Sequence, residues 1–452
     1  MKKLLKNIDL LATFGSRGEI TGGAVLIEDN VIIKVGKTEE MENIEVDEVE
    51  DLSGRVVLPG FVNTHHHFYQ TLFRNVKEVQ SAKLFDWLVH LYDRWKHIEE
   101  EAVASSTKVA IYEMMKSGVT TTTDMFYLFP HGKDELFDVE IETAVKTGVR
   151  FHPTRGSMSL SRKDGGLPPD EVVEPDERIL RESERVVKQY HDPRKYSMLR
   201  IALAPCSPFS VTPQLMRDTV ELAEKYDVLL HTHLAETQDE EAFCLEKFGK
   251  RPVDYMEELG WLNPRVWFAH LVWLNEDDIK KLEEYDVGMA HCPVSNMRLG
   301  SGIAPVYEMK GRIRIGLAVD GSASNDTNNM IAEIRTAMLL QRVKYGADAL
   351  TPREVLHMAT VGGAQVLRMD DYIGKIEEGY AADIVAFRLD TLEMSGCLDD
   401  PLAAIVMCDA KSADFVMING VTKIKNGEFL DVDLEEIISK QNEISKTILQ
   451  KL

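Results

Sequence analysis

Two histidine pairs in the chain have the spacing of metal ligands. His65 and His67 follow one short apolar run, and His231 and His233 lie in another. Side chains on a strand alternate between its two faces, so the two members of each pair point the same way. Two imidazoles on one face can chelate a single divalent ion. A polar strand end with incidental histidines is the alternative for either pair alone, and the spacing does not say whether His231 or His233 would bind.

Three further residues that could move protons stand at or just beyond the ends of apolar runs. Glu236 lies three residues beyond His233, His270 ends the run VWFAH, and Asp320 ends the run IGLAVD. Each of them alone could be a satisfied polar residue of the core. Together with the histidine pairs, they place metal-binding and proton-transferring groups on four different strands. This combination predicts a metal-dependent site rather than several coincidences.

These residues need a scaffold that brings many strand ends together. From about residue 58 to residue 371, eight short apolar runs alternate with amphipathic helical stretches and end near His65, Asp124, Arg155, Pro205, Glu236, His270, His291 and Asp320. Eight βα units of this kind predict an α/β fold of the (β/α)8 TIM-barrel type, in which the carboxyl ends of all strands meet at one mouth. A doubly wound open sheet, which gathers its ligands at a single switch point, is the alternative.

The two ends of the chain predict a different kind of structure. Residues 1–57 and 372–430 contain short alternating runs separated by turns, and we expect them to combine into one small β-sandwich beside the barrel. Residues 431–452 have helical periodicity, with an apolar stripe that could pack on the chain's own body or contact another subunit. The segment 156–197 reads as one long loop at the barrel mouth, either a lid or a rigid decoration.

Composition disfavours several kinds of partner. The 452 residues carry a formal net charge of −23, and nucleic acid is a poor partner for such a chain because phosphate contacts need clustered Lys and Arg. The five cysteines are widely spaced and form no CxxC pair, so we expect neither a disulfide framework nor a zinc finger. No apolar run approaches the ~18 residues that cross a bilayer. We expect a cytoplasmic protein with a small-molecule substrate, no membrane partner, and possible assembly into a homo-oligomer.

Several motifs resemble those of the amidohydrolase superfamily: PGFVNTHHH, HTHLAE and VDGSASND, followed by GKIEEGYAADIVAF after the barrel. The resemblance covers essentially the whole chain and implies one divalent ion with four ligands, His65, His67, His233 and Asp320. It implies a structural role for His231. Two-metal members bridge their ions with a carboxylated lysine, whereas the fourth predicted strand ends here in APCS, which favours a single ion. Zinc is the expected metal, and Fe²⁺ or Mn²⁺ are alternatives that such a site would also hold.

This ligand set predicts hydrolysis with a proton relay. A divalent ion lowers the pKa of a bound water from 15.7 toward ~7, and Asp320 stands where it can take the water's proton. Glu236 can protonate a ring nitrogen of the substrate. His270 can hydrogen-bond the attacking hydroxide and the developing tetrahedral centre. Having both Glu236 and Asp320 favours deamination, because chlorohydrolase relatives that lack one of these acids lose part of this proton relay.

The region after the first barrel strand suggests the shape of the substrate. The stretch FYQTLFRNVKEVQSAKLFDWLVHLYDRW is strongly aromatic, which suits a flat heterocycle, although most of these rings are expected to pack the loop on the barrel. Four residues are the expected substrate contacts. Gln70 would hydrogen-bond the edge of the ring, and Glu236 would protonate a ring nitrogen. Trp87 and Cys206 would be wall residues of the pocket, and Cys206 is not expected to be a metal ligand.

Longer motifs narrow the resemblance to one branch of the superfamily. HHHFYQTLFR, HPTRGSMSLSRKDGGLPPD and HCPVSNMRLGSGIAP resemble the 8-oxoguanine deaminase branch, whose members have often been labelled hydroxydechloroatrazine ethylaminohydrolase-like. The likeness implies hydrolysis of the 2-amino group of 8-oxoguanine to give urate and ammonia. Guanine, isoxanthopterin or another pterin, and hydroxyatrazine-type amino-s-triazines are alternative substrates for the same machinery. An inactive scaffold barrel is a further alternative, disfavoured because degenerate relatives usually lose metal ligands and this chain keeps them.

Overall fold

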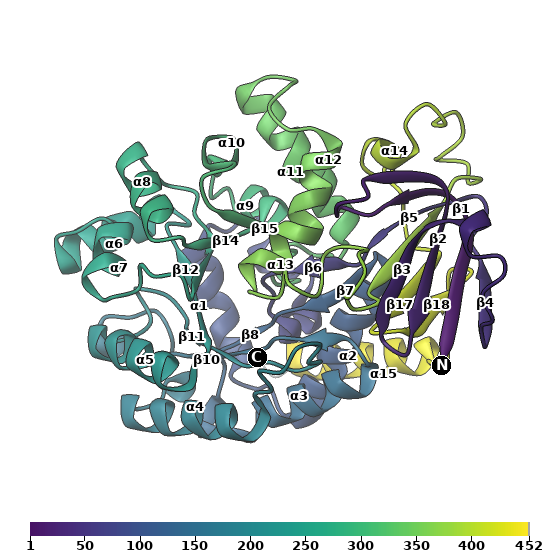
Figure 1. The fold of residues 1–452 in the computed structure, drawn as a ribbon. Coiled ribbons are helices and arrows are strands. Elements are labelled where there is room, and N and C mark those ends of the chain that lie inside the picture. The colour runs from purple at the N-terminus through teal and green to yellow at the C-terminus, as the bar shows by residue number, and fades with distance from the viewer. Residues whose placement is uncertain (451–452) are drawn as a thin grey trace.

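The computed structural model describes residues 1–450, and its central part is a barrel of parallel strands (Figure 1). Ten short strands build it: β6 (Phe61–Asn63), β7 (Val119–Thr122), β8 (Met125–Phe126), β9 (Arg150–Phe151), β10 (Thr154–Ser157), β11 (Ala202–Pro205), β12 (Leu229–Leu234), β13 (Val266–His270), β14 (Gly288–His291) and β15 (Arg314–Leu317). They fill eight positions, because β7 continues into β8, and β9 into β10, after breaks of two residues. Pro153 stands in the second break, where it has no N–H for a neighbouring strand.

A hydrogen bond between the first and last strands closes the barrel. The backbone N–H of Thr64, just after β6, donates to the carbonyl oxygen of Leu317 in β15 over 3.1 Å. The carboxyl ends of all the strands therefore meet at one mouth, and the predicted (β/α)8 barrel is confirmed.

Helices follow the barrel strands and cover the outside of the barrel (Figure 1). The longer ones are α2 (Glu100–Lys116), α3 (Glu135–Thr147), α4 (Asp176–Tyr190), α5 (Pro213–Tyr226), α6 (Gln238–Phe248), α8 (Glu276–Glu284) and α11 (Met330–Tyr345). The prediction of one long loop over 156–197 was wrong, because α4 fills much of that segment. Charged residues dominate α4, and its buried face is narrow: Ile179, Ser183, Val186 and Val187. These four residues keep the i, i+4, i+7, i+8 spacing of one helix face, so the periodic signal was present, and the loop prediction followed instead from Gly165-Gly166 and Pro168-Pro169 before it.

The two ends of the chain form one nine-stranded sheet beside the barrel (Figure 1). Its strands are β1 (Lys2–Ala12), β2 (Glu19–Glu28), β3 (Val31–Lys37), β4 (Glu48–Asp51), β5 (Arg55–Pro59), β16 (Ile384–Arg388), β17 (Phe415–Ile418), β18 (Val421–Lys425) and β19 (Glu428–Phe429). β5 and β16 join the two halves as antiparallel neighbours, with Val57 opposite Ala386. The β-rich domain built from both ends is thus present. The proposed borders at residues 57, 371 and 430 stay predictions.

The C-terminal helix packs on the body of its own chain. α15 (Leu434–Leu449) lies against α2, where the hydroxyl of Ser105 donates to the side-chain oxygen of Gln441 over 2.8 Å. Ile444 and Ile448 are buried. The apolar stripe of this helix is therefore used, at least in part, within the chain. Residues 451 and 452 of the predicted helix lie outside the described residues.

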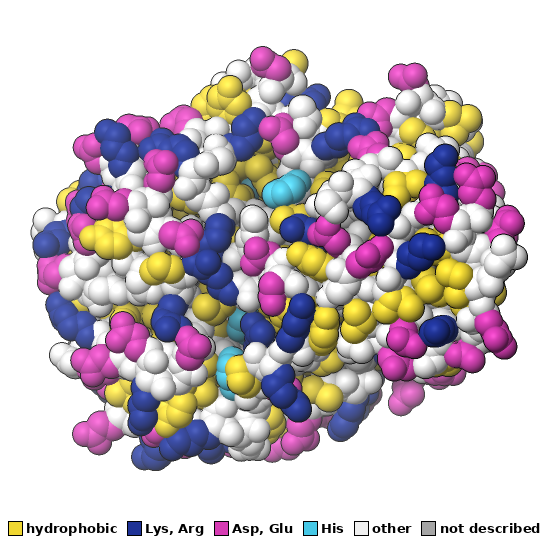
Figure 2. All heavy atoms as spheres, in the orientation of Figure 1, with side chains coloured by type: hydrophobic (Ala, Val, Ile, Leu, Met, Phe, Trp, Pro, Cys, Tyr) yellow, Lys and Arg dark blue, Asp and Glu magenta, His cyan; other side chains and the backbone are white. Residues whose placement is uncertain are grey.

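Three structural features concern the partners considered from composition. Acidic and basic side chains are interspersed over the face drawn in Figure 2. All five cysteines are free thiols. Within residues 1–450, no helix combines the length and the apolar character needed to cross a membrane.

Candidate active site

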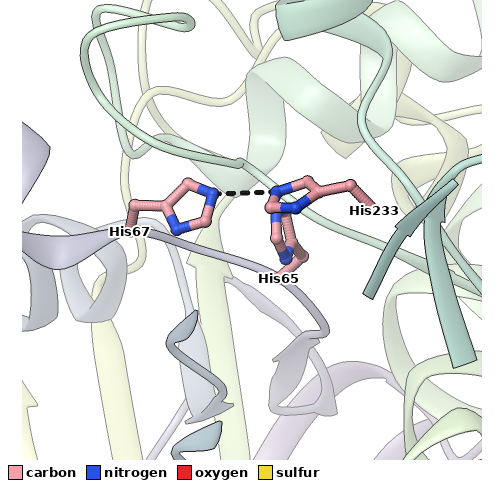
Figure 3. A group of neighbouring side chains, drawn as sticks. All are labelled: His65, His67 and His233. Atoms are coloured by element: carbon pink, nitrogen blue, oxygen red, sulfur yellow. Dashed lines mark hydrogen bonds between the residues drawn. The ribbon is translucent and has the colours of Figure 1, made fainter. Parts of the chain in front are cut away.

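Four predicted ligands meet at the mouth of the barrel. His65 and His67 lie just beyond β6, His233 lies in β12, and Asp320 follows β15. The Nε2 atoms of His67 and His233 are 3.2 Å apart (Figure 3). Asp320 Oδ1 lies 3.3 Å from Nε2 of His65 and 3.6 Å from Nε2 of His67. Residues more than 250 positions apart in the chain thus present donor atoms to one small volume.

Hydrogen bonds on the far side of each ring determine which nitrogen carries its proton. Nδ1 of His67 lies 2.9 Å from the Met125 carbonyl oxygen, and Nδ1 of His233 lies 2.6 Å from the Cys206 carbonyl oxygen. A carbonyl oxygen only accepts, so both Nδ1 atoms must be N–H donors. Their Nε2 atoms therefore present lone pairs to the centre of the group.

A second histidine, His231, determines which ring nitrogen of His65 carries the proton. Nδ1 of His231 lies 2.8 Å from the carbonyl oxygen of Trp267 and must donate, which leaves Nε2 of His231 as an acceptor. Nδ1 of His65, 2.7 Å from that acceptor, then donates to it. His231 thus acts on the orientation of His65 rather than facing Asp320, as the sequence resemblance implied.

The donor set fits a divalent cation. Nε2 of His65 has no hydrogen-bond partner among the described residues, and the lone pairs of the three rings face one another and a carboxylate with no proton between them. Together with His270, the atoms of these four residues fall into two overlapping groups, each within 4.8 Å: His65, His67 and His233, and His65, His270 and Asp320. Burial lowers the pKa of His65, His67 and His233, which keeps the rings neutral as metal ligands must be.

Asp320 is held in a strained backbone conformation. Its φ is +60°, a left-handed value that costs a non-glycine residue of order 1 kcal/mol or more. The N–H of Gly321 donates to Oδ1 over 2.6 Å, and the hydroxyl of Ser324 donates to Oδ2 over 3.1 Å. Burial acts to raise the pKa of Asp320, but the adjacent imidazoles of His65, His270 and His67 outweigh it, and the pKa is lowered well below its usual range. The carboxylate is therefore an anion with oriented lone pairs.

Glu236 is placed by a clamp on the backbone around it. The buried carboxylate of Glu240 accepts the N–H groups of Ala235 and Glu236, each over 2.9 Å. Ala235 is left-handed, with φ +53°, and its carbonyl oxygen accepts from the backbone N–H groups of residues 272 and 273, each over 2.9 Å. Ser301 donates to Oε1 of Glu236 over 3.3 Å. Burial is the main cause that raises the pKa of Glu236, so this acid can hold and deliver a proton.

His270 stands between the two acids. Its Nδ1 lies 2.9 Å from the side-chain oxygen of Asn296 and donates to it, which turns Nε2 toward Glu236 Oε2, 3.6 Å away. Burial acts to lower the pKa of His270, but the carboxylates of Glu236 and Asp320 outweigh it and the pKa is raised. The ring can therefore be protonated beside two acids and stabilise negative charge that develops near them.

The residues that orient this site were not predicted from the sequence. Asn296 and Ser301 reach the site from a segment distant from the residues that they support, and Glu240 lies four residues beyond Glu236 in the same segment. Of the three, only Glu240 belongs to a recognisable sequence pattern. Thr237 and Glu240 have the T-x-x-E spacing of a helix start, and Thr237 caps α6 by accepting from the N–H of Glu240. The spacing signals a capping role and gives no hint of the clamp on Glu236.

The four predicted substrate contacts line one cavity beside these residues. Gln70, Trp87, Cys206 and Glu236 all face it, together with Tyr92, Tyr127, Phe209 and Leu299. Trp87 Nε1 donates to the Ala323 carbonyl oxygen over 3.2 Å, which ties α1 (Leu84–Trp95) to the loop after Asp320. The cavity volume is about 40 Å³. Cavities of about 560 and 710 Å³ lie elsewhere, and none of the candidate ligands lines them, so chemistry and not size identifies the site.

Comparisons with known proteins agree with this arrangement. The model of the amidohydrolase family matches residues 56–423. 8-Oxoguanine deaminase of Pseudomonas aeruginosa is 46% identical over 440 residues, which cover 97% of this chain and 98% of that protein. Hydroxydechloroatrazine ethylaminohydrolase of Pseudomonas sp. (strain ADP) is 33% identical, with 99% and 92% covered. The crystal structure of an Arthrobacter aurescens atrazine chlorohydrolase complexed with zinc matches with a TM-score of 0.93 at 31% identity, covering 98% and 100% of the two chains.

Proposed function

The chain belongs to the amidohydrolase family, and from this premise we propose that it is a metal-dependent hydrolytic deaminase of an amino-substituted heterocycle, with 8-oxoguanine as its substrate. One observation carries the proposal: three imidazole lone pairs converge on the Asp320 carboxylate, beside a buried Glu236 that can hold a proton. The 46% identical relative named 8-oxoguanine deaminase supports the choice of substrate. The free cysteines support a reducing compartment such as the cytoplasm.

We assign the metal ligands to His65, His67, His233 and Asp320. A divalent ion bound there supplies a nucleophile near neutral pH, because it lowers the pKa of water. Zinc is the metal that we propose, since the similar atrazine chlorohydrolase structure contains zinc. The neutral imidazoles and the lack of protons between the donor atoms suit this ion.

The protein's own groups then carry the protons of the reaction. Asp320 takes a proton from the attacking water, and Glu236 gives one to the ring nitrogen next to the amino-bearing carbon, which makes that carbon more electrophilic. His270 hydrogen-bonds the oxygen that adds to this carbon. The C–N bond breaks as a proton from Asp320 passes to the leaving amine, and the hydroxyl on the same carbon gives its proton to Glu236 as it becomes the carbonyl. The sum is one water consumed, one carbonyl formed and one ammonia released.

The cavity sets a condition on substrate binding. The cavity volume of about 40 Å³ is small beside the ~300–1,000 Å³ of typical small-molecule sites, so the cavity must widen to admit a bicyclic heterocycle. Leu84, Trp87, Leu88 and Tyr92 of α1 form part of its wall. We propose that these side chains move outward when the ring enters, and that Gln70, which now accepts the N–H of Ala323 over 3.3 Å, turns its amide to the ring edge.

A substrate panel on metal-quantified protein tests the proposal. Ammonia release is measured with 8-oxoguanine, guanine, isoxanthopterin and hydroxyatrazine side by side, and we expect the highest kcat/KM with 8-oxoguanine. A higher value with another of the four would transfer the assignment to that substrate. Absence of turnover with all four in metal-loaded protein would contradict the deaminase assignment and favour a scaffold role.

The variant Glu236→Gln tests the proton relay separately. It keeps the shape of the side chain and leaves the four metal ligands intact. We expect an unchanged metal content and a kcat lower by roughly 10²- to 10⁴-fold, the usual contribution of general acid–base catalysis. Undiminished ammonia release would rule out Glu236 as the acid.

A further inference from the structure

α1 presents one side to the cavity through residues at helical spacing. Leu84, Trp87, Leu88 and Tyr92 line the cavity, at intervals of three, one and four residues. The first three offer apolar surface, apart from the Trp87 N–H, which is used by Ala323. Tyr92 brings a hydroxyl group, so this side of the helix carries a single polar group that could recognise a ligand.

Within the described part of the chain, the Tyr92 hydroxyl has no hydrogen-bond partner. The side chain is fully buried, and no described residue donates to or accepts from its oxygen. A buried hydroxyl without a partner costs about 1–3 kcal/mol, and most buried polar groups in proteins have one. An unpaired hydroxyl on the wall of the substrate cavity is explained if the ligand supplies the partner.

The hydroxyl is a hydrogen-bond donor at neutral pH. Burial raises the pKa of Tyr92 well above 10, and the nearby Cys206 and Tyr69 add to the rise. The phenol therefore keeps its proton. An acceptor on the ligand, such as a carbonyl oxygen, is the natural complement of this group.

The position of the reacting carbon says which edge of the ring can reach Tyr92. Under the proposed function, the carbon that bears the amino group lies beside Asp320 and Glu236, at the strand ends. α1 contributes none of the candidate metal ligands and forms a different part of the wall. In a 2-aminopurine the far end of the bicyclic ring is C8, and 8-oxoguanine has a carbonyl oxygen there, whereas guanine has only hydrogen.

We propose that Tyr92 determines specificity by donating a hydrogen bond from its hydroxyl to the carbonyl oxygen on C8 of the substrate. The inference rests on the proposed function and extends it to one atom of the substrate. It makes Tyr92 a substrate-binding residue, distinct from the groups that move protons. Its removal should therefore weaken recognition of the oxidised base and leave the metal site intact.

The variant Tyr92→Phe tests this, because it deletes only the hydroxyl. Tyr255→Phe is the matched control: the Tyr255 hydroxyl is also buried without a partner among residues 1–450, but Tyr255 stacks on Phe248 away from the cavity. For each protein, kcat/KM is measured with 8-oxoguanine and with guanine. Dissociation constants are measured for the two deamination products, urate and xanthine, which differ in the same oxygen.

We expect Tyr92→Phe to lower kcat/KM for 8-oxoguanine and the affinity for urate about tenfold, the effect of one hydrogen bond, with changes under twofold for guanine and xanthine. Tyr255→Phe should change none of the four values. Equal losses with both bases, or no loss with either, would overturn the role of Tyr92. In that case the proposed function still stands if the wild-type enzyme turns over 8-oxoguanine. A wild-type enzyme inactive on 8-oxoguanine and unable to bind urate would overturn both.

Discussion

Replacing Glu240 by glutamine tests whether the backbone clamp positions Glu236. In the wild-type chain the two carboxylate oxygens each accept one backbone N–H at 2.9 Å. Glutamine keeps one acceptor and turns an NH₂ group toward the second N–H. The variant loses one charge-assisted hydrogen bond and leaves a buried N–H unpaired, at a cost of about 1.5–3 kcal/mol. If misplacement of Glu236 adds this cost to the free energy of the transition state, kcat/KM falls roughly ten- to hundredfold.

The same substitution should change the free energy of unfolding little, because the buried Glu240 carboxyl group is costly to ionise. Burial raises the pKa of Glu240 from 4.5 to about 7, which corresponds to about 3 kcal/mol of cost for the ionised form. Because the folded pKa lies above the unfolded one, the contribution of Glu240 to stability is fully present below about pH 4.5 and declines as the pH rises to about 7. Glutamine carries no such cost, which offsets the lost hydrogen bond above pH 7.

The assay compares Glu240→Gln with Glu241→Gln, whose carboxylate pairs with Arg251 at a more exposed position. Metal content, thermal midpoint and kcat/KM are measured at pH 7.5. We expect Glu240→Gln to keep its metal, to shift the midpoint by only a few degrees, and to lose activity, whereas Glu241→Gln keeps activity. Full activity in Glu240→Gln refutes the clamp, and loss of metal together with activity shows that the substitution acted on the metal site instead.

Three further perturbations follow from the site and its surroundings. His233→Asn should lower the bound metal far below that of the wild-type chain, by elemental analysis after dialysis, and lose turnover with it; retained stoichiometric metal would remove His233 from the ligand set. Asn296→Ala should lower kcat roughly ten- to hundredfold with little change in KM, because His270 loses the acceptor that orients its ring, and an unchanged kcat would show that the ring needs no such partner. Burial raises the pKa of Asp124 to about 8 and that of its neighbour Glu140 well above the usual range, so stability should decline as the pH rises from about 4 to 8. Glu140→Gln should flatten that decline in urea midpoints, and an unchanged slope would mean that this pair is not its source.

The sequence predicted the elements that carry the site because their signals are local. The alternation of side chains on an extended segment placed His65 and His67 on one face, although the regular strand ends at Asn63. His66, which lies between them, hydrogen-bonds Asn328 at 2.8 Å. Runs of apolar residues ending in polar ones likewise predicted the barrel strands.

The parts that were missed depend on contacts between distant segments. Spacing did not separate His231 from His233, because the two share a face and differ only in depth; the hydrogen bond between His231 and His65 distinguishes them. The supports from Asn296 and Ser301 have no spacing signature at all. α4 was missed for a different reason: its buried residues keep helical spacing, but most of its other residues are polar or charged, and Gly165-Gly166 and Pro168-Pro169 before it indicated a loop.

Anomalous diffraction at a metal absorption edge, from crystals of the metal-quantified enzyme, tests the central claim most directly. We expect one peak per chain, within ligand distance of Nε2 of His65, His67 and His233 and of one oxygen of Asp320, with activity that follows occupancy. A peak elsewhere, or full activity in chains that carry no metal, would contradict it.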